Sequence, residues 1–578
     1  MNQITDEDNV NEAKPEDNKP LDKNTVICAL IKFVLPIAAV FAVSIIGVMA
    51  LGSETIAQYQ NANPDKTTAK EYIGTKSGDN LGSNRRVLSD YGQFYDSLKK
   101  VSLYGDYNST TNLMTEGDDE SDVTKTNGSF IYAVNNRSLV ITDIRKGRLG
   151  GSKNFKPEFK AASDIIIELY VTNDNLVIIT SHYEDKKDQT ICYCYDLKVG
   201  DEPELIGSMS QDGSYFTSRK VNGQIYLFTR LFLSRPDMDK PEAISKDGLA
   251  EWVPQINGRY ISYDCIYVGS ESIRGTLASS FSIVSPDRII DSKLIMDTSE
   301  NIYVAEDAIY FYETNYAGRT ITEISKMSYK DGKLETGASA SVGGWIADSF
   351  AIRQYNGSLY VLATDNTSNY ASNTGRSQDV NTFYVFDQNL KQTGEISDIA
   401  RGERVYAARF VGDYAYFITY ETTDPLFIAD ISDPKNPRIL SELKVTGFSE
   451  YLHSWDKNHI LGIGFGDREE ADATRAIKLV MFDVTDPANP KEENQLMIKN
   501  PGQYCEVMYN YKAILAAPEK NLIGLVADDY HMYSYSKDKG FERVIQQELK
   551  EPNNSGYRGL YAGDNIYIAS SAEVIQVK

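Results

Sequence analysis

The sequence DISDPKNP at residues 430–437 recurs as DVTDPANP at residues 483–490, 53 positions further on. The same spacing separates Asp143 from Asp196, each at the end of a predicted strand. A period of about 40–55 residues built from short strands and tight turns is typical of propeller blades. The prolines suit turns at a sheet edge, because proline cannot donate to a strand ladder and pre-sets the turn dihedral. We therefore interpret the aspartates mainly as turn caps, with a role as ligands as the alternative.

The unit around these octamers repeats along most of the chain: a turn centred on Gly, Asn or Asp leads into a strand, and a second strand ends in Asp. Eight well-formed copies and a partial ninth can be counted, so we predict an all-β fold with an eight-bladed β-propeller over residues 104–578. Seven and nine blades are the alternatives. We expect the partial C-terminal copy to complete the ring by pairing with strands from the start of the domain. Residues 235–285 fit the repeat least well and predict an insertion or long loop at Pro236–Trp252.

The composition narrows the class of protein. The chain has 578 residues, a formal net charge of −23, 39 tyrosines and only four histidines. So acidic a body repels phosphate, and no basic stripe offsets the repulsion, which excludes nucleic acid as a partner. Five cysteines are few for a domain of this size held by disulfides. Cys192 and Cys194 fall on one face of a predicted strand, where packing side by side suits them better than a disulfide.

The N-terminal part predicts a membrane anchor. Residues 1–24 are polar and acidic and are expected to be a disordered cytoplasmic tail. The run from Phe33 to Leu51 carries no charge over 19 residues, a helix of about 28 Å, so residues 25–51 are predicted to span a membrane once. Lysines precede the run and the next follows only at Lys66, which places the N-terminus in the cytoplasm and the C-terminal domain outside the cell. A cleaved signal peptide ending near Ala50 is the less favoured alternative.

Two shorter segments join the anchor to the repeats. Residues 52–86 are rich in Gly, Ser, Asn, Thr and Lys and predict a flexible spacer. A short amphipathic helix that docks on the body is predicted over residues 87–103, because apolar residues recur at spacings of three and four, namely Leu88, Tyr91, Tyr95, Leu98 and Val101.

Three groups of residues are candidates for a site. Arg and Glu on a strand lining the centre can bind a carboxylate or phosphate, and a structural ion pair explains them equally well; these are Glu403, Arg404 and Arg409. Half of the histidines occur close together with an aspartate, as His453, Asp456 and His459, where structural roles are favoured over a triad or a metal pair. An acidic cluster offers the oxygen ligands that calcium takes, but a solvated segment before a strand is favoured; it comprises Glu116, Asp118, Asp119, Glu120 and Asp122. No cofactor is predicted beyond this calcium alternative.

Longer segments resemble one family. TEGDDESDVTKTNGSFIYAV at 115–134, ARGERVYAARFVGDYAYFITYETTDPLFIADISDPKNP at 400–437 and LSELKVTGFSEYLHSWDKNHILGIGFG at 440–466 are similar to prokaryotic secreted or membrane-anchored proteins. Their C-terminal β-propeller is distantly related to WD-40 repeats. The resemblance runs from about residue 85 to 578 and implies a β-propeller outside the cytoplasm. It implies no established activity.

Two functions follow as hypotheses. The first is a non-enzymatic binding or interaction scaffold at the cell envelope, with a membrane tether and a protein, peptide or glycan as partner. The second is an envelope enzyme acting on a polysaccharide or small molecule at the central channel. Paired carboxylates in that channel would favour the enzyme. The first hypothesis is preferred because the sequence contains no catalytic constellation.

Overall fold

The structure is a computed structural model, and the chain divides into two compact units, residues 1–79 and 80–578. It describes residues 86–87, 91, 94 and 119–577, with gaps at 185–186, 198–201, 234–251, 270–271, 297–300, 317–318, 367–378, 421–423, 446–447, 467–475, 500–504 and 552–555. The predicted cytoplasmic tail, the segment 25–51 and residues 52–85 of the spacer lie outside the described residues. Among the residues that are described, no helix combines the length and the apolar character needed to cross a membrane.

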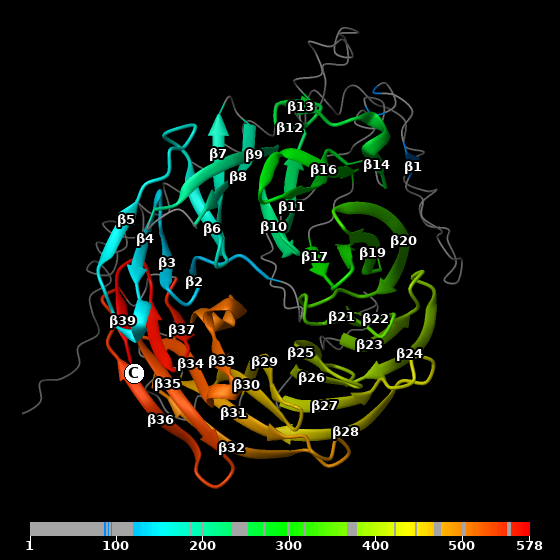
Figure 1. The fold of residues 1–578 in the computed structure, drawn as a ribbon. Coiled ribbons are helices and arrows are strands. Elements are labelled where there is room, and N and C mark those ends of the chain that lie inside the picture. Colours follow the sequence, from blue (N-terminus) through cyan, green and yellow to red (C-terminus); the bar gives the residue numbers. More distant parts are fainter. Residues whose placement is uncertain are drawn as a thin grey trace, which may run out of the picture. The chain divides into compact units, whose positions relative to one another are not determined.

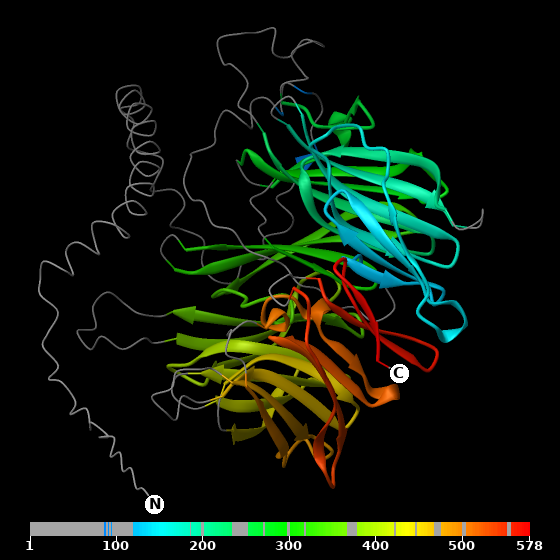
Figure 2. The same cartoon turned by 90° about the vertical axis from the view of Figure 1, so that its left-hand side faces the viewer.

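Nine sheets, which we call blades 1 to 9, follow one another in chain order around a centre, with the first strand of each blade innermost (Figures 1 and 2). Their repeat strands pair antiparallel, and the added strand β14 (Ile266–Val268) pairs with β16 (Ser285–Met296) in parallel. The last sheet has three strands, and the other eight are built on four. Blade 1 contacts blade 9 through β2 and β37, so the ring is closed.

The strands of blades 1 to 4 are β2 (Thr124–Thr126), β3 (Phe130–Asn135), β4 (Ser138–Asp143) and β5 (Ser152–Phe155); β6 (Ile165–Val171), β7 (Asn175–Glu184), β8 (Lys187–Asp196) and β9 (Glu204–Asp212); β10 (Ser214–Val221), β11 (Gln224–Phe232), β15 (Arg274–Ser282) and β16 (Ser285–Met296); and β17 (Asn301–Val304), β18 (Ala308–Asn315), β19 (Ile321–Lys330) and β20 (Lys333–Gly343).

The strands of blades 5 to 7 are β21 (Ile352–Tyr355), β22 (Ser358–Asn366), β23 (Asp379–Phe386) and β24 (Gln392–Ile399); β25 (Arg404–Val411), β26 (Tyr414–Tyr420), β27 (Asp424–Asp430) and β28 (Arg438–Val445); and β29 (Phe448–Asp456), β30 (His459–Phe465), β31 (Ile477–Asp483) and β32 (Lys491–Ile498). Blades 8 and 9 consist of β33 (Leu515–Ala517), β34 (Leu522–Ala527), β35 (Asp529–Ser536) and β36 (Gly540–Gln547); and β37 (Arg558–Ala562), β38 (Asn565–Ala569) and β39 (Val574–Gln576). Short 3-10 turns are η2 (Arg145–Gly147), η5 (Tyr263–Cys265), η6 (Glu506–Met508), η7 (Tyr511–Ala513) and η8 (Pro518–Lys520).

The predicted number of eight blades is wrong, and the alternative of nine is the one observed. The partial C-terminal copy forms a sheet of its own, β37–β38–β39. No strand from the start of the domain pairs with it among the described residues. The sequence shows the ninth copy but not its pairing, because strand pairing at a ring closure depends on contacts between residues hundreds of positions apart.

The turns have the predicted chemistry. Asn222 and Gly223 have φ values of 49° and 78°, and Asn356 and Gly357 have values of 48° and 76°. A positive φ at both central residues is characteristic of a type I′ turn. The twist of this turn matches that of the two strands it connects, and the pair Asn-Gly adopts it most readily. The turns Asn222–Gly223 and Asn356–Gly357 therefore fix the first hairpins of blades 3 and 5.

The repeated octamers are turn-capping elements, as predicted. Asp433 Oδ1 accepts a hydrogen bond from the Lys435 amide at 3.0 Å, and Asp486 Oδ1 accepts one from the Ala488 amide at 3.1 Å. The following asparagine side chain donates to the second carboxylate oxygen in both copies, at 2.7 and 2.8 Å. These are Asx turns, which explains why Asp recurs at this position.

The same turns dock each blade on the one before it. Thr393 Oγ1, on β24 of blade 5, lies 3.5 Å from the Pro434 carbonyl of blade 6, and Ser441 Oγ, on β28 of blade 6, donates to the Pro487 carbonyl of blade 7 at 2.7 Å. Gly394 gives the first turn room, because a Cβ there would lie 2.4 Å from the Pro434 oxygen. The octamers thus hold neighbouring blades as well as their own hairpins.

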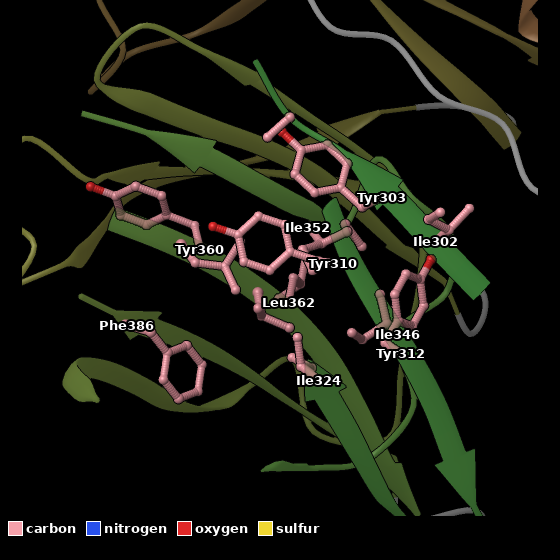
Figure 3. Close-up of a cluster of buried hydrophobic side chains, with 14 of the residues drawn as sticks. Ile302, Tyr303, Tyr310, Tyr312, Ile324, Ile346, Ile352, Tyr360, Leu362 and Phe386 are labelled. Carbon is pink, nitrogen blue, oxygen red and sulfur yellow. The ribbon is translucent and has the colours of Figure 1, made fainter. Parts of the chain in front are cut away.

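The hydrophobic core lies between the faces of neighbouring blades, and buried tyrosines join the blades (Figure 3). Tyr310 and Tyr360 are 2% and 1% exposed. The hydroxyl of Tyr310 donates to Gln354 Oε1 of the next blade at 2.9 Å, and that of Tyr360 donates to the Ile431 carbonyl of the next blade at 3.2 Å. A buried tyrosine thus supplies apolar area while its polar tip finds a partner, which gives the abundant tyrosines a structural use.

The irregular stretch of the sequence is an insertion between β11 and β15. Its described part forms β12 (Gln255–Ile256) and β13 (Arg259–Tyr260), which extend blade 2, and β14 (Ile266–Val268), which extends blade 3. Arg86 and Val87, at the end of the predicted spacer and the start of the predicted helix, form the strand β1 (Arg86–Val87) and pair with β14. The insertion therefore links two blades and the N-terminal segment.

Part of the predicted amphipathic helix is described, at Tyr91 and Phe94, and both have helical backbone. Phe94 is fully buried, and its ring lies 5.3 Å from that of Trp252. The Tyr91 hydroxyl donates to the Ile261 carbonyl at 2.6 Å. These two residues contact the insertion; of them, Tyr91 belongs to the predicted apolar spacing, whereas Phe94 was not part of it.

The cysteines in the described residues are unpaired thiols. Cys192 and Cys194 lie on β8 with their side chains fully buried. Burial raises the pKa of Cys194 to about 12. Both act as small apolar core residues.

Candidate functional site

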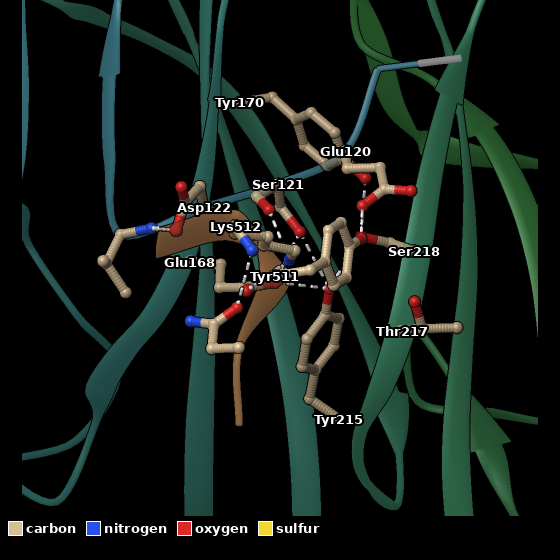
Figure 4. A network of polar contacts seen from close by, with 12 residues as sticks. Glu120, Ser121, Asp122, Glu168, Tyr170, Tyr215, Thr217, Ser218, Tyr511 and Lys512 are labelled. Carbon is tan, nitrogen blue, oxygen red and sulfur yellow. Dashed lines mark hydrogen bonds and ion pairs between the residues drawn. The ribbon is translucent and has the colours of Figure 1, made fainter. Parts of the chain in front are cut away.

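The ring is closed by a polar cluster that we call the clasp. Its centre is the segment Asp119–Asp122, which precedes β2 and crosses the first strands of two blades. Asp119 forms a backbone bridge with Lys220 of β10, and Asp122 forms one with Leu169 of β6. The segment thus brings the beginning of the described repeats against blades 2 and 3 (Figure 4).

Each acidic residue of the segment pairs with a different cation. Glu120 lies 3.0 Å from the guanidinium of Arg219 on β10. Asp122 binds Arg558 of β37, with Oδ2 to Nε and Oδ1 to Nη2 distances of 2.9 and 3.0 Å. Arg558 also donates to Glu506 of η6 at 3.1 Å. Asp119 lies 2.5 Å from Lys125.

Lys512 of η7 crosses to the same segment from blade 8. Its ammonium group donates to the Ser121 carbonyl at 2.6 Å and to Glu168 Oε1 at 2.7 Å. The Ser121 hydroxyl donates to the other oxygen of Glu168 at 2.6 Å, and the Tyr511 hydroxyl donates to Glu120. The clasp therefore joins blades 1, 2, 3, 8 and 9. Figure 4 shows the part around Ser121, Glu168 and Lys512.

Burial sets the electrostatics of the clasp. Desolvation raises the pKa of Glu120, and Arg219 opposes that rise. Desolvation alone would lower the pKa of Arg558, but the Asp122 and Glu506 carboxylates hold it above its ordinary value. Paired and buried, these groups are structural: a buried ion pair needs its partner, because an uncompensated buried charge costs several kcal/mol.

The calcium alternative gains no support from this geometry. Asp119, Glu120 and Asp122 diverge toward separate cations, while Glu116 and Asp118 lie outside the described residues. Within the residues that the structure describes, no group of three or more His, Cys, Asp or Glu side chains is arranged to hold a metal ion.

A second set of polar residues forms what we call the axial band. Each member lies on the first strand of a blade and pairs with a residue of the second strand. That partner stands two positions after the second-strand residue that closes the hairpin. The band follows seven consecutive blades as Lys125, Tyr170, Arg219, Tyr303, Arg353, Arg409 and His453. A bulge between Ser454 and Asp456 moves His453 into this register.

Neighbours in the band reach one another around the ring. The Lys125 ammonium group lies 5.6 Å from the centre of the Tyr170 ring. The Tyr170 hydroxyl is 2.8 Å from Ser218 Oγ, next to Arg219, and the Tyr303 hydroxyl accepts from the Gln354 amide, next to Arg353, at 3.1 Å. These contacts connect the band from blade 1 to blade 3 and from blade 4 to blade 5.

The structure divides the first group of predicted site residues. Arg409 belongs to the axial band, with its guanidinium 5.3 Å from the centre of the Phe350 ring. Glu403 accepts a hydrogen bond from Thr419 Oγ1 at 2.5 Å, and Arg404 lies 3.5 Å from Asp379. Glu403 and Arg404 thus bind other partners, and they do not form a joint site with Arg409.

The histidine group is divided in the same way. His453 belongs to the band, and its Nδ1 is 2.9 Å from the Tyr451 hydroxyl. His459 contacts both oxygens of Asp456 at 2.9 Å and lies 3.6 Å from Glu493, at the hairpin turn of blade 7. The predicted pair Asp456–His459 therefore forms without His453.

Sequence reasoning missed Arg219, Tyr303, Arg353 and Arg558. The first three share a signal: each stands two residues before the residue that closes a hairpin turn, opposite a tyrosine on the second strand. Arg558 stands four residues before Ala562, which closes the hairpin of blade 9, so it lies outside that register, and its partners Asp122 and Glu506 are distant in sequence. No local pattern identifies it.

Two groups beside Arg409 should give the protein a composite pH dependence. Desolvation, with a smaller effect of Arg409, lowers the pKa of His453 to about 3, and desolvation raises the pKa of Asp348 to about 6. In the unfolded chain these values are about 6.5 and 3.9. As pH falls from 6.5 towards 3, the unfolded chain gains a proton at His453 that the folded chain does not, so the fold is destabilised. As pH falls from 6 to 4, the folded chain gains the proton at Asp348 first, so the fold is stabilised.

We expect opposite effects from removing the two groups. Between pH 7 and pH 5, the free energy of unfolding should fall less in His453→Gln than in the wild type, and more in Asp348→Asn. Urea denaturation at both pH values measures this. Changes of the same sign in both variants would show that these groups do not set the pH dependence.

The closed ring of nine sheets, eight built on four antiparallel strands and the last on three, defines the chain as a β-propeller. The chain belongs to the Beta propeller domain family, whose model matches residues 108–578. The resemblance in the sequence is therefore confirmed.

Archaeal relatives cover most of the chain. An uncharacterized protein of Methanocaldococcus jannaschii is 25% identical, over 81% of this chain and 81% of its own length. An uncharacterized protein of Archaeoglobus fulgidus is 26% identical, over 81% and 82%. Among solved structures, Hsv2 of Kluyvelomyces marxianus matches 65% of this chain and 98% of its own, with 9% identity and a TM-score of 0.32. A eukaryotic initiation factor matches 77% and 92%, with 11% identity and a TM-score of 0.35.

Proposed function

We propose that the protein is a binding scaffold anchored in the cell membrane through residues 25–51, with the propeller outside the cytoplasm. Its partner is an envelope protein, peptide or glycan. One observation carries the binding role: large aromatic side chains are exposed at the ends of the second strands of three consecutive blades. We call Tyr183, Phe232 and Tyr316 the aromatic arc.

The arc lies on one face of the ring. Tyr183 is near the end of β7, Phe232 ends β11, and Tyr316 follows β18, and they are 56%, 69% and 68% exposed. Single exposed apolar residues are ordinary, but a recurrence at equivalent places in neighbouring blades marks a contact surface. Aromatic residues are enriched in interfaces because they offer a large apolar area at little cost in conformational entropy.

The enzyme alternative has less support. A carboxylate pair that catalyses glycoside hydrolysis has to face its substrate. In the clasp, Glu120, Asp122 and Glu168 are each held by a cation at 3.0 Å or less. These carboxylates are engaged in the ion pairs that close the ring.

Site-specific photo-cross-linking in cells tests the binding role. A photoreactive amino acid placed at Phe232 should give discrete cross-linked products. The matched control is Val284, which is 65% exposed in the same blade but lies in the turn between β15 and β16, at the opposite end of the strands. Equal products from both positions, or none from Phe232, would contradict a partner at the aromatic arc.

The location is tested separately. Protease added to intact cells should cleave the propeller, and the protein should stay in the membrane fraction after carbonate extraction. Deletion of residues 25–51 should release it into the soluble fraction. An intact propeller in protease-treated cells, with cleavage only after lysis, would overturn the external location and leave the binding role standing.

A further inference from the structure

The cationic side chains of the axial band differ in whether an acidic side chain neutralises them. Lys125 is paired with Asp119, and Arg219 is paired with Glu120. Arg353, on β21, has neither a hydrogen bond nor an ion pair from its side chain to any described residue, although it is half-buried. In a chain with a net charge of −23, an arginine on an inner strand that has no acidic partner among the described residues needs an explanation.

The neighbours of Arg353 add positive charge and hydrogen-bond donors. Arg409 occupies the equivalent position in the next blade. Asp348, the carboxylate nearest in the chain, already accepts hydrogen bonds from the amides of Phe350 and Ala351 at 2.8 and 3.2 Å. On the other side, the Tyr303 hydroxyl accepts from the Gln354 amide, so its own proton is available to an acceptor.

We propose that Arg353, Arg409 and Tyr303 form an oxyanion-binding site in the axial band, which takes a phosphate or carboxylate group. A guanidinium presents two parallel N–H groups that match the oxygens of such a group, and partial burial strengthens the interaction by excluding water. His453 is the member of the axial band in the blade after that of Arg409, and its Nδ1 lies 2.9 Å from the Tyr451 hydroxyl. This site is separate from the aromatic arc and goes beyond the proposed binding role.

Titration calorimetry of the full-length protein in detergent tests the site. Two probes separate the sources of the oxyanion: inorganic phosphate and succinate. We expect the wild type to bind one of them and Arg353→Ala to bind it at least about tenfold more weakly. Arg353→Lys should fall between the two, because lysine keeps the charge but not the planar fork.

Arg401→Ala is the matched control. Arg401 is 58% exposed and pairs at the surface with Asp398 at 2.6 Å, outside the band, so its loss should leave binding unchanged. Equal urea midpoints of the two alanine variants would show that both are folded. The proposal is overturned if the wild type binds neither probe, or if Arg353→Ala and Arg401→Ala bind alike.

Discussion

Substitution of Arg558 by alanine is expected to lower the free energy of unfolding by about 3–5 kcal/mol, because two carboxylates lose their cation inside the clasp. Arg558, Asp122 and Glu506 have only 4%, 16% and 7% of their side-chain surface exposed. Water therefore cannot replace the guanidinium well. The loss should act on the closure of the ring, since Arg558 begins blade 9 and Asp122 precedes blade 1.

Urea denaturation followed by circular dichroism measures the effect. Arg438→Ala is the control, because Arg438 pairs with Asp430 at a similar distance, 3.0 Å, but is 70% exposed. Surface ion pairs contribute about 0–1 kcal/mol, so this variant should unfold close to the wild type. If both variants lost the same stability, the clasp would not be what closes the ring.

The sequence predicts the blades well because their determinants are local. An Asn-Gly pair requires no distant contact to form its turn, and the aspartates of the octamers cap the turns in which they stand. Tyrosine on the second strand is equally local in pattern, yet its bond to the next blade becomes visible only in three dimensions. The blade number was predicted incorrectly because the last copy was expected to pair with strands from the start of the domain, whereas it forms a sheet of its own. No local sequence pattern shows which strands pair where the ring closes.

The candidate site was less predictable for the same reason. Asp122 and Arg558 are 436 positions apart in the chain but form a bidentate ion pair. The acidic cluster could be noticed, but its cations come from three different elements, β2, β10 and β37. Arg409 and His453 were singled out for separate reasons, and only the strand register places them in one band. The bulge at Trp455 decides that register, and it has no clear sequence signal.

The second large loss of stability is expected from a substitution in the insertion, the least regular part of the sequence. Trp252→Ala should destabilise the protein by about 3–5 kcal/mol, the usual cost of removing a buried aromatic side chain and leaving a cavity. Trp252 is 2% exposed and contacts both Phe94 and Tyr91, with ring centroids 5.3 and 6.5 Å away. The urea midpoint should be followed by circular dichroism, because the protein has only three tryptophans and fluorescence would change with the substitution itself.

Phe232→Ala is the matched control for this variant. Phe232 is also a large aromatic residue at the edge of the insertion, but it is 69% exposed, so its removal should change the stability by no more than about 0.5 kcal/mol. Because Phe94 and Tyr91 dock on the insertion and β1 pairs with β14, Trp252→Ala should also expose residues 86–94 to protease before the blades unfold. Cleavage of that segment at the wild-type rate would mean that strand pairing with β14, rather than packing on Trp252, holds the N-terminal segment to the propeller.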